Sequence, residues 1–273
     1  MLTVSIPNEI KSLLEEKLIN TGGKIDYIYK WLDNHFKKEY FLQQDNKIES
    51  IHLDVAMFSD FFSILKGKKI RTIGIDFPIY LSKGENKPTL MVCALDPLRN
   101  EIENKNPTTK VDFWVPFSII NNPINQTKHS EKENLTFFHT LLNSYNLYIT
   151  DIYKIFYREG NMKSNSLTDF KSLLIHKEIL ENEIKIMQPD AILTLGNNTR
   201  DIISNLYNLN PPKWTNEVFI TNLEEELKIV MIPHISGAAR GASTPIKKNP
   251  KYKNITGRNN EKYANIVLNV LKK

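Results

Sequence analysis

Short apolar runs alternate with segments of helical periodicity over the last two thirds of the chain. The runs are TLMVCAL (89–95), NLYIT (146–150), DAILTL (190–195) and KIVMI (228–232). A continuous apolar run of this length is typical of a strand that is buried on both faces of a sheet. The alternation predicts an α/β fold with a central parallel four-stranded sheet flanked by helices, an α/β/α sandwich with right-handed crossovers.

The segments between these runs carry the expected helices and turns. Apolar spacing predicts helices over 131–145, after the capping signature SLTD and up to Met187, from about Asn198, and over the apolar positions between Tyr263 and Leu271. Residues 70–81 are rich in β-branched and aromatic types and predict strands, with SKGENKP as the turn that follows. The Gly, Pro, Asn and Lys residues of 240–260 predict a mobile loop.

The amino-terminal region has a different pattern. Ile10, Leu13, Leu14 and Leu18 recur at helical spacing, and a second helical pattern passes through Ile28, Trp31, Leu32 and Phe36. We therefore expect residues 1–69 to form a helical extension packed on the core, and residues 70–273 to form the principal domain.

Composition excludes several classes of protein. Cys93 is the only cysteine, so the chain can form neither an internal disulfide nor a four-cysteine iron–sulfur cluster or zinc knuckle. No window approaches the roughly 18 apolar residues that a membrane span needs, and the amino terminus lacks the pattern of a signal peptide. We expect a cytoplasmic protein that needs no metal and no cofactor.

Positive charge is concentrated at the carboxyl terminus. Residues 240–273 hold nine basic residues and one acid, which gives this segment a charge of +8 in a chain whose net charge is +5. A cationic segment on a near-neutral body indicates an anionic polymer as partner, because binding to phosphates releases counterions. A solvated lysine-rich tail explains the same composition equally well.

Polar residues follow each apolar run directly. Asp96-Pro97, Asp151, Gly196-Asn197-Asn198 and Pro233-His234 come immediately after the predicted strands. Because ligands bind at the carboxyl ends of the strands in open parallel sheets, we expect these residues to meet at one edge.

Three of these segments together resemble the uracil-DNA glycosylase superfamily, over roughly residues 89–241. ALDPLRN (94–100) is similar to the first motif of that family, VPFSI (115–119) to its Phe-Ser segment, and HISGAARG (234–241) to its second motif. The resemblance implies the glycosylase fold and an enzyme that flips a base out of DNA and cuts its N-glycosidic bond. The branches that carry an iron–sulfur cluster are excluded by the single cysteine.

The resemblance assigns roles to residues that have plainer explanations when each is taken alone. Asp96 matches the aspartate that stabilises the sugar cation and orients water, and His234 matches the neutral imidazole that donates to O2 of the base. Phe117 matches the aromatic that stacks on the flipped base. Asp96 also fits a turn before proline, His234 a structural histidine, and Phe117 an ordinary core residue.

The second motif and the residues beyond it are expected to bind DNA. Ser236 and the backbone amides of Gly237 and Ala238 match the family's phosphate contacts. Basic residues just beyond them, Arg240, Lys247, Lys248 and Lys251, are placed to hold backbone phosphates. Ala238 and Ala239 stand where the family often has a bulky apolar wedge, so another residue must fill the gap or the substrate is single-stranded or loosely stacked.

Two departures from the family bear on the base that is removed. Asp151 stands where the family has an asparagine that reads uracil, and a carboxylate accepts from the N4 amine of cytosine. Leu98 replaces a tyrosine that crowds C5 of the pyrimidine, so a substituent at C5 would fit. With Ala94 and Leu95 as further pocket residues, the expected substrate is a 5-modified cytosine such as the hydroxymethylated or glucosylated base of phage DNA. Asp151 also fits a helix cap or a side chain turned away from the pocket.

The sequence therefore predicts a monomeric, monofunctional DNA glycosylase that leaves an abasic site, either in DNA repair or in defence against phage. No lysine in the matched motifs stands where a Schiff-base nucleophile would be expected. Three alternatives remain: a uracil-DNA glycosylase, a non-catalytic DNA-binding member of the fold, and a doubly wound enzyme that acts on free nucleosides or nucleotides.

Overall fold

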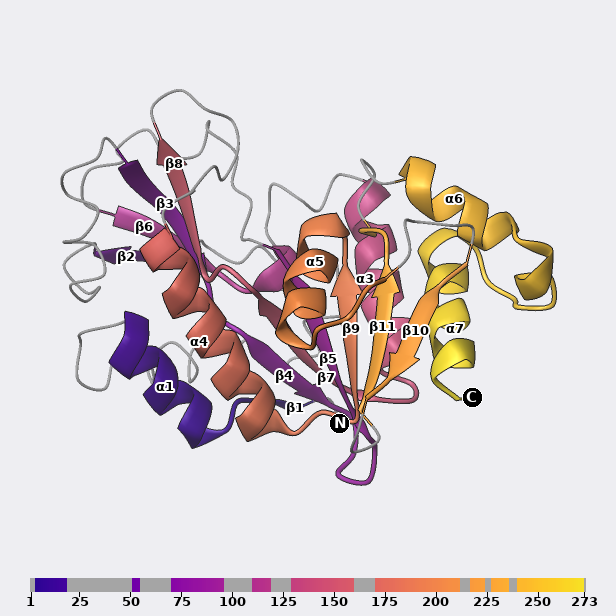
Figure 1. Cartoon of the computed structure of the whole chain (residues 1–273), viewed down its shortest axis with the longest axis horizontal. Coiled ribbons are helices and arrows are strands. Elements are labelled where there is room, and N and C mark those ends of the chain that lie inside the picture. Colours follow the sequence, from indigo (N-terminus) through magenta and orange to yellow (C-terminus); the bar gives the residue numbers. More distant parts are fainter. Residues whose placement is uncertain are drawn as a thin grey trace.

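The computed structural model describes residues 3–18, 51–54, 70–95, 110–118, 129–159, 170–211, 217–223, 227–235 and 240–272. A seven-stranded sheet runs through the centre of these residues (Figure 1). In spatial order its strands are β1 (Thr3–Ser5), β4 (Ile79–Ser82), β7 (Asn146–Asp151), β5 (Thr89–Ala94), β9 (Ala191–Leu195), β11 (Lys228–Ile232) and β10 (Phe219–Asn222).

The four central strands of this sheet are parallel. β5 pairs in parallel with both β7 and β9, and β9 pairs in parallel with β11. These are the four strands that the apolar runs predict, and their central residues are buried because helices cover both faces. The predicted size of four strands is wrong, since β1, β4 and β10 add antiparallel strands at the two edges.

Helices cover the sheet on both faces, as the alternation predicts. The helices are α1 (Asn8–Leu18), α3 (His129–Leu141), α4 (Phe170–Met187), α5 (Asn197–Leu206), α6 (Arg240–Lys248) and α7 (Asn259–Leu271). α3 and α7 pack on each other and on the face that carries Val92 and Leu193. Leu180 of α4 and Ile203 of α5 pack on the other face, against Cys93 and Ile192.

A second, four-stranded sheet is joined to the first by a short turn. Its order is β2 (Ile51–Asp54), β6 (Lys110–Trp114), β3 (Ile70–Asp76) and β8 (Ile155–Glu159). The chain passes from β7 into β8 through residues 152–154. Strands were predicted over 70–81, but the sheet was not, because its four strands come from four separate regions of the sequence.

Two sequence predictions need correction at the ends of the chain. The pattern of Ile10, Leu13, Leu14 and Leu18 is confirmed, since all four are buried on α1, but β1 and β2 are strands within the region predicted as helical. Residues 19–50 lie outside the described part, so the second amino-terminal helix stays a prediction. The mobile loop predicted for 240–260 is wrong: α6 fills its first half, and the 3-10 turn η7 (Pro250–Tyr252) follows. Within the described ranges, every helix is too short or too polar to cross a membrane.

Candidate active site

The strand-end residues meet at the carboxyl edge of the parallel strands, as their positions predict. Ala94 and Asp151 are register partners at the last paired position of β5 and β7. Beyond this pair, Ile152 N donates to Ala94 O at 2.9 Å and Tyr153 N donates to Leu95 O at 2.8 Å. The two strand ends are therefore held together up to the residue that precedes Asp96.

Two predicted site residues from distant parts of the sequence lie side by side at this edge. The rings of Phe117, in the turn η4 (Pro116–Ser118), and His234, after β11, are stacked with centroids 5.7 Å apart and planes 25° apart. Phe117 also contacts the ring of Phe138 on α3, at 4.9 Å. The structure therefore brings an imidazole and an aromatic ring from two distant segments into contact.

Phe117 has an unusual backbone conformation. Its φ is 62° and its ψ is 14°, in the left-handed region that bulky side chains rarely adopt. Such a conformation costs on the order of 1–3 kcal/mol and is concentrated at functional sites. In this conformation the Phe117 ring lies against His234.

The segment that carries His234 is held by α7. Tyr263 Oη donates to Pro233 O at 3.4 Å, and Asn260 Nδ2 donates to Ile235 O at 3.2 Å. Burial lowers the pKa of the His234 imidazole below its ordinary value of 6.5, because the charged form loses its hydration. The imidazole is therefore neutral at pH 7, with an N–H that can donate to a carbonyl oxygen.

A cavity of about 350 Å³ opens beside His234 at the same edge. Leu95 lines it from the residue after β5, Asn197 and Asn198 line it from the start of α5, and Ala242 lines it from α6. Gly196 begins α5 with a φ of 97°, and a Cβ there would lie 3.6 Å from Cβ of His234. Glycine at this position lets the chain turn from β9 into α5 next to the imidazole.

Asp151 is buried at the end of β7, with 2% of its surface exposed. It shares the register position of Ala94, and side chains at one register position of adjacent strands lie on the same face of a sheet. Its neighbours Leu147 and Ile149 belong to the core that α3 and α7 cover, which Phe117 also contacts. Asp151 therefore faces the same side of the sheet as the aromatic ring.

The structure describes nine of the predicted site residues. These are Ala94, Leu95, Phe117, Asp151, His234, Arg240, Lys247, Lys248 and Lys251. The first five lie at the carboxyl edge, and the last four lie on α6 and η7. Asp96, Leu98, Ser236, Gly237 and Ala238 lie outside the described residues, so their roles stay predictions.

The predicted DNA-binding lysines differ in their surroundings. Lys248 is exposed, whereas the Lys247 ammonium lies 5.9 Å from the centre of the Tyr263 ring. Lys251 forms an ion pair with Glu217, which raises the pKa of the lysine. An exposed ion pair of this kind is weak, so Lys251 can still exchange its partner for a phosphate.

A buried polar network behind Asp151 was not predicted. The Lys154 ammonium lies 2.9 Å from the Glu183 carboxylate, and both side chains have no exposed surface. Tyr148 Oη donates to Glu183 at 2.9 Å from the same side of the sheet. The available signal was Glu183 among the apolar positions of α4, where a charge needs a buried partner.

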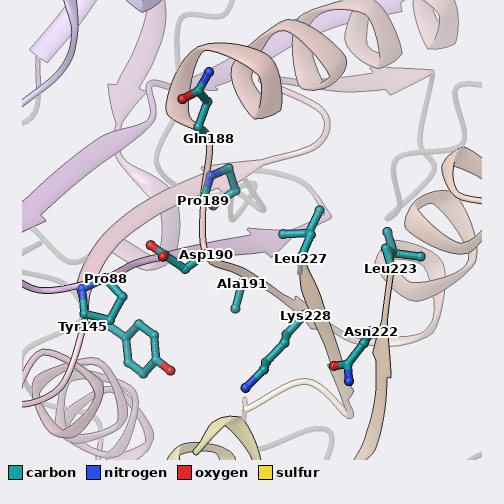
Figure 2. Close-up of a pocket in the computed structure, with 10 residues that line it drawn as sticks. All are labelled: Pro88, Tyr145, Gln188, Pro189, Asp190, Ala191, Asn222, Leu223, Leu227 and Lys228. Carbon is teal, nitrogen blue, oxygen red and sulfur yellow. The ribbon is translucent and has the colours of Figure 1, made fainter. Parts of the chain in front are cut away.

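A larger hollow, of about 820 Å³, lies at the opposite, amino edge of the strands (Figure 2). Its charged side chains are engaged with the backbone: Asp190 accepts from Thr89 N at 2.7 Å, and Lys228 donates to Leu271 O at 2.9 Å. The first contact joins the starts of β9 and β5, and the second joins β11 to the end of α7, so both residues have a structural explanation without a ligand. The carboxyl edge is therefore the better candidate for chemistry.

Comparison with protein-family models and with curated proteins found no match to this chain. Within the described residues, there is no group of three or more His, Cys, Asp or Glu side chains arranged to hold a metal ion.

Proposed function

We propose that the protein is a DNA glycosylase of the uracil-DNA glycosylase type, with the pyrimidine pocket at the carboxyl edge of the parallel strands. The stacked rings of Phe117 and His234 carry this proposal. The sequence motifs assigned both residues to the pocket, and their rings lie next to each other although 116 residues lie between them in the chain.

The proposed reaction is hydrolysis of the N-glycosidic bond. As the bond between the base and C1′ breaks, its electron pair stays on the base and positive charge develops on the sugar. Neutral His234 donates a hydrogen bond to O2 of the base and stabilises the negative charge there. Asp96 stabilises the sugar cation and orients the water whose oxygen then bonds to C1′; the base leaves with a proton, and an abasic site remains.

The proposed substrate is a cytosine-type base with a substituent at C5. Asp151 supports this choice, because a buried carboxyl group at the end of β7 faces the same side as Phe117 and complements the N4 amine. Leu98 leaves room at C5. DNA is the proposed partner, and the basic residues of α6 and η7 are proposed to contact its phosphates.

The deciding experiment offers the protein oligonucleotides that contain uracil, cytosine, hydroxymethylcytosine or glucosylated hydroxymethylcytosine, followed by alkaline cleavage at abasic sites. We expect release of the modified cytosine and a loss of about 100-fold to 1000-fold in rate for His234→Leu. His139→Leu, on α3, is the matched control. If uracil is released as fast as any cytosine derivative, the proposed substrate is wrong. If no base is released from any oligonucleotide, the proposed activity is wrong.

A further inference from the structure

The buried pair of Lys154 and Glu183 lies directly behind the end of β7, on the side of the sheet that α4 covers. Thr150 and Tyr148, its neighbours on β7, face α4, whereas Asp151 faces α3 and α7. The pair therefore lies outside the base pocket and has no access to a substrate. It is nevertheless connected to the pocket through the backbone.

Lys154 uses its three ammonium protons within this region. Its Nζ donates to Glu183 Oε2 at 2.9 Å, to the backbone oxygen of Asp151 at 2.5 Å, and to the Thr150 hydroxyl. The register of β4 on β7 ends at Ile149, so Asp151 lies beyond the last residue of β7 that pairs with β4. Lys154 takes the place of a strand partner for this carbonyl.

The backbone of Lys154 is fixed as well. Its oxygen accepts from Asp76 N, at the end of β3, at 2.9 Å, and its N–H donates to His176 Nδ1 on α4 at 3.4 Å. The residues between Asp151 and Lys154 continue the pairing with β5 through the amides of Ile152 and Tyr153. One lysine thus connects the end of β7, helix α4 and the second sheet.

Burying two charged side chains to hold a turn has a large cost in desolvation free energy. Removing both ions from water costs several kcal/mol per ion, and an apolar pair of similar size is often as stable or more stable. The position of the Asp151 backbone explains the pair better than stability does, because Lys154 holds the Asp151 carbonyl in place.

We propose that Lys154 and Glu183 are positioning residues that fix Asp151 against the pyrimidine and so determine which base is accepted. This inference rests on the proposed function, because the position of Asp151 is tested through the ratio of cytosine-type to uracil excision. A side chain that discriminates an amine from a carbonyl must be held within a fraction of an ångström, since a displaced carboxylate neither accepts from the N4 amine nor repels the O4 carbonyl. The pair supplies that constraint from behind the strand.

The test replaces the pair by apolar residues, Lys154→Met with Glu183→Leu, so that no buried charge is left unpaired. The matched control is Lys177→Met with Glu181→Leu, which removes an exposed pair of the same types from the same helix. Hydrogen exchange is measured at the amides of Ile152 and Tyr153, with Val92 and Leu193 as core references. The ratio of cytosine-type to uracil excision is measured in parallel.

We expect the double variant to keep its core protection, to exchange the Ile152 and Tyr153 amides at least tenfold faster, and to lose at least tenfold in the excision ratio. The control should change neither quantity. An unchanged ratio overturns the inference, even if exchange accelerates. If the double variant does not fold, Glu183→Gln is measured in the same way, and an unchanged ratio in that variant overturns the inference as well.

The two proposals fail in different ways. If the wild-type protein releases no base, the proposed function is wrong. The exchange rates of Ile152 and Tyr153 then still decide whether the pair fixes the turn, because that measurement needs no substrate.

Discussion

At the scale of single residues, burial sets the properties of both histidines that matter most. His234 beside Phe117 loses its charge because burial lowers the pKa of its imidazole. His176 on α4 is fully buried, and desolvation followed by the nearby Lys154 charge lowers its pKa to about 3. The first histidine is therefore neutral at pH 7, and the second accepts a hydrogen bond from the backbone of Lys154.

Replacement of Phe117 by leucine should separate stacking from packing. Leucine keeps apolar contact with Phe138 but removes the aromatic face, and stacking of a base on an aromatic ring contributes about 1–3 kcal/mol. We expect kcat/KM for base excision to fall by roughly 5-fold to 150-fold. Phe137→Leu, in the same aromatic cluster on α3, should leave excision nearly unchanged. Equal kinetic effects of the two substitutions would contradict a stacking role.

His176 should make the protein sensitive to acid. Its pKa is about 3 in the folded protein and 6.5 ordinarily, so the unfolded chain binds the extra proton between these values. The free energy of unfolding therefore falls as pH drops below about 6.5, by up to ~1.4 kcal/mol per pH unit from this residue. Urea unfolding at pH 7, 6 and 5 should show a shallower decline for His176→Asn than for the wild type. Parallel declines would show that His176 does not cause the effect.

At the scale of elements, the sequence predicts best what a single strand or helix determines by itself. The four parallel strands were predicted because each contains apolar residues at consecutive positions, which a strand with one solvated face does not. α1 was predicted because four apolar residues share one face. The edge strands β1 and β10 have three and four residues, too few to show a period.

The candidate site likewise contains residues that the sequence predicts and residues that only the structure shows. Asp151, Phe117 and His234 were predicted because short motifs mark them, and the structure brings their segments to one edge. Lys154 and Glu183 are 29 residues apart, and only the packing of α4 on the sheet joins them. Glu183 among the apolar positions of α4 indicates that a buried charge needs a partner, but no local pattern identifies Lys154 as that partner.

The start of α7 depends on a glycine. Gly257 has a φ of 109°, and a Cβ there would lie 2.8 Å from Lys262 N. Glu261 closes the same turn by accepting from Arg258 N at 3.2 Å. We expect Gly257→Ala to lower the free energy of unfolding by about 2 kcal/mol or more, measured by denaturant titration.

Gly84→Ala is the control for this substitution. Gly84 lies in the turn before β5, where an added Cβ would meet nothing within 4 Å. Its effect should stay within about 0.5 kcal/mol. If both alanine variants unfold at the same denaturant concentration, the conformation of Gly257 is not what stabilises the helix start.

At the scale of the whole molecule, positive charge and the candidate pocket lie on neighbouring elements. α6 contributes Ala242 to the cavity beside His234 and carries Lys247 and Lys248 in its last turn. A DNA strand whose base enters the pocket would therefore pass close to these lysines. We therefore expect the DNA strand whose base enters the cavity to be the strand whose phosphates contact these lysines.

Neutralising Lys247 and Lys248 should weaken DNA binding mainly at low salt. Each phosphate contact contributes about 0.9 to the slope of log K against log salt for duplex DNA, so Lys247→Gln with Lys248→Gln should reduce that slope by about 1.8. Fluorescence anisotropy over a salt series measures it. Lys177→Gln with Lys185→Gln, two exposed positions on α4, should leave the slope unchanged. An unchanged slope in the α6 variant would place the DNA elsewhere.

The turn of 152–154 between the two sheets is too short to accept a deletion or an insertion without loss of its contacts. Residues 152–154 must carry the chain from β7 to β8 while two of their amides bond to β5 and Lys154 reaches back to Asp151. Related chains should therefore preserve the length of this turn even where its residue types drift. The turn of 83–88 at the other edge should keep its length for a different reason, because the Asn146 side chain accepts from Lys83 N and donates to the backbone oxygens of Gly84 and Lys87.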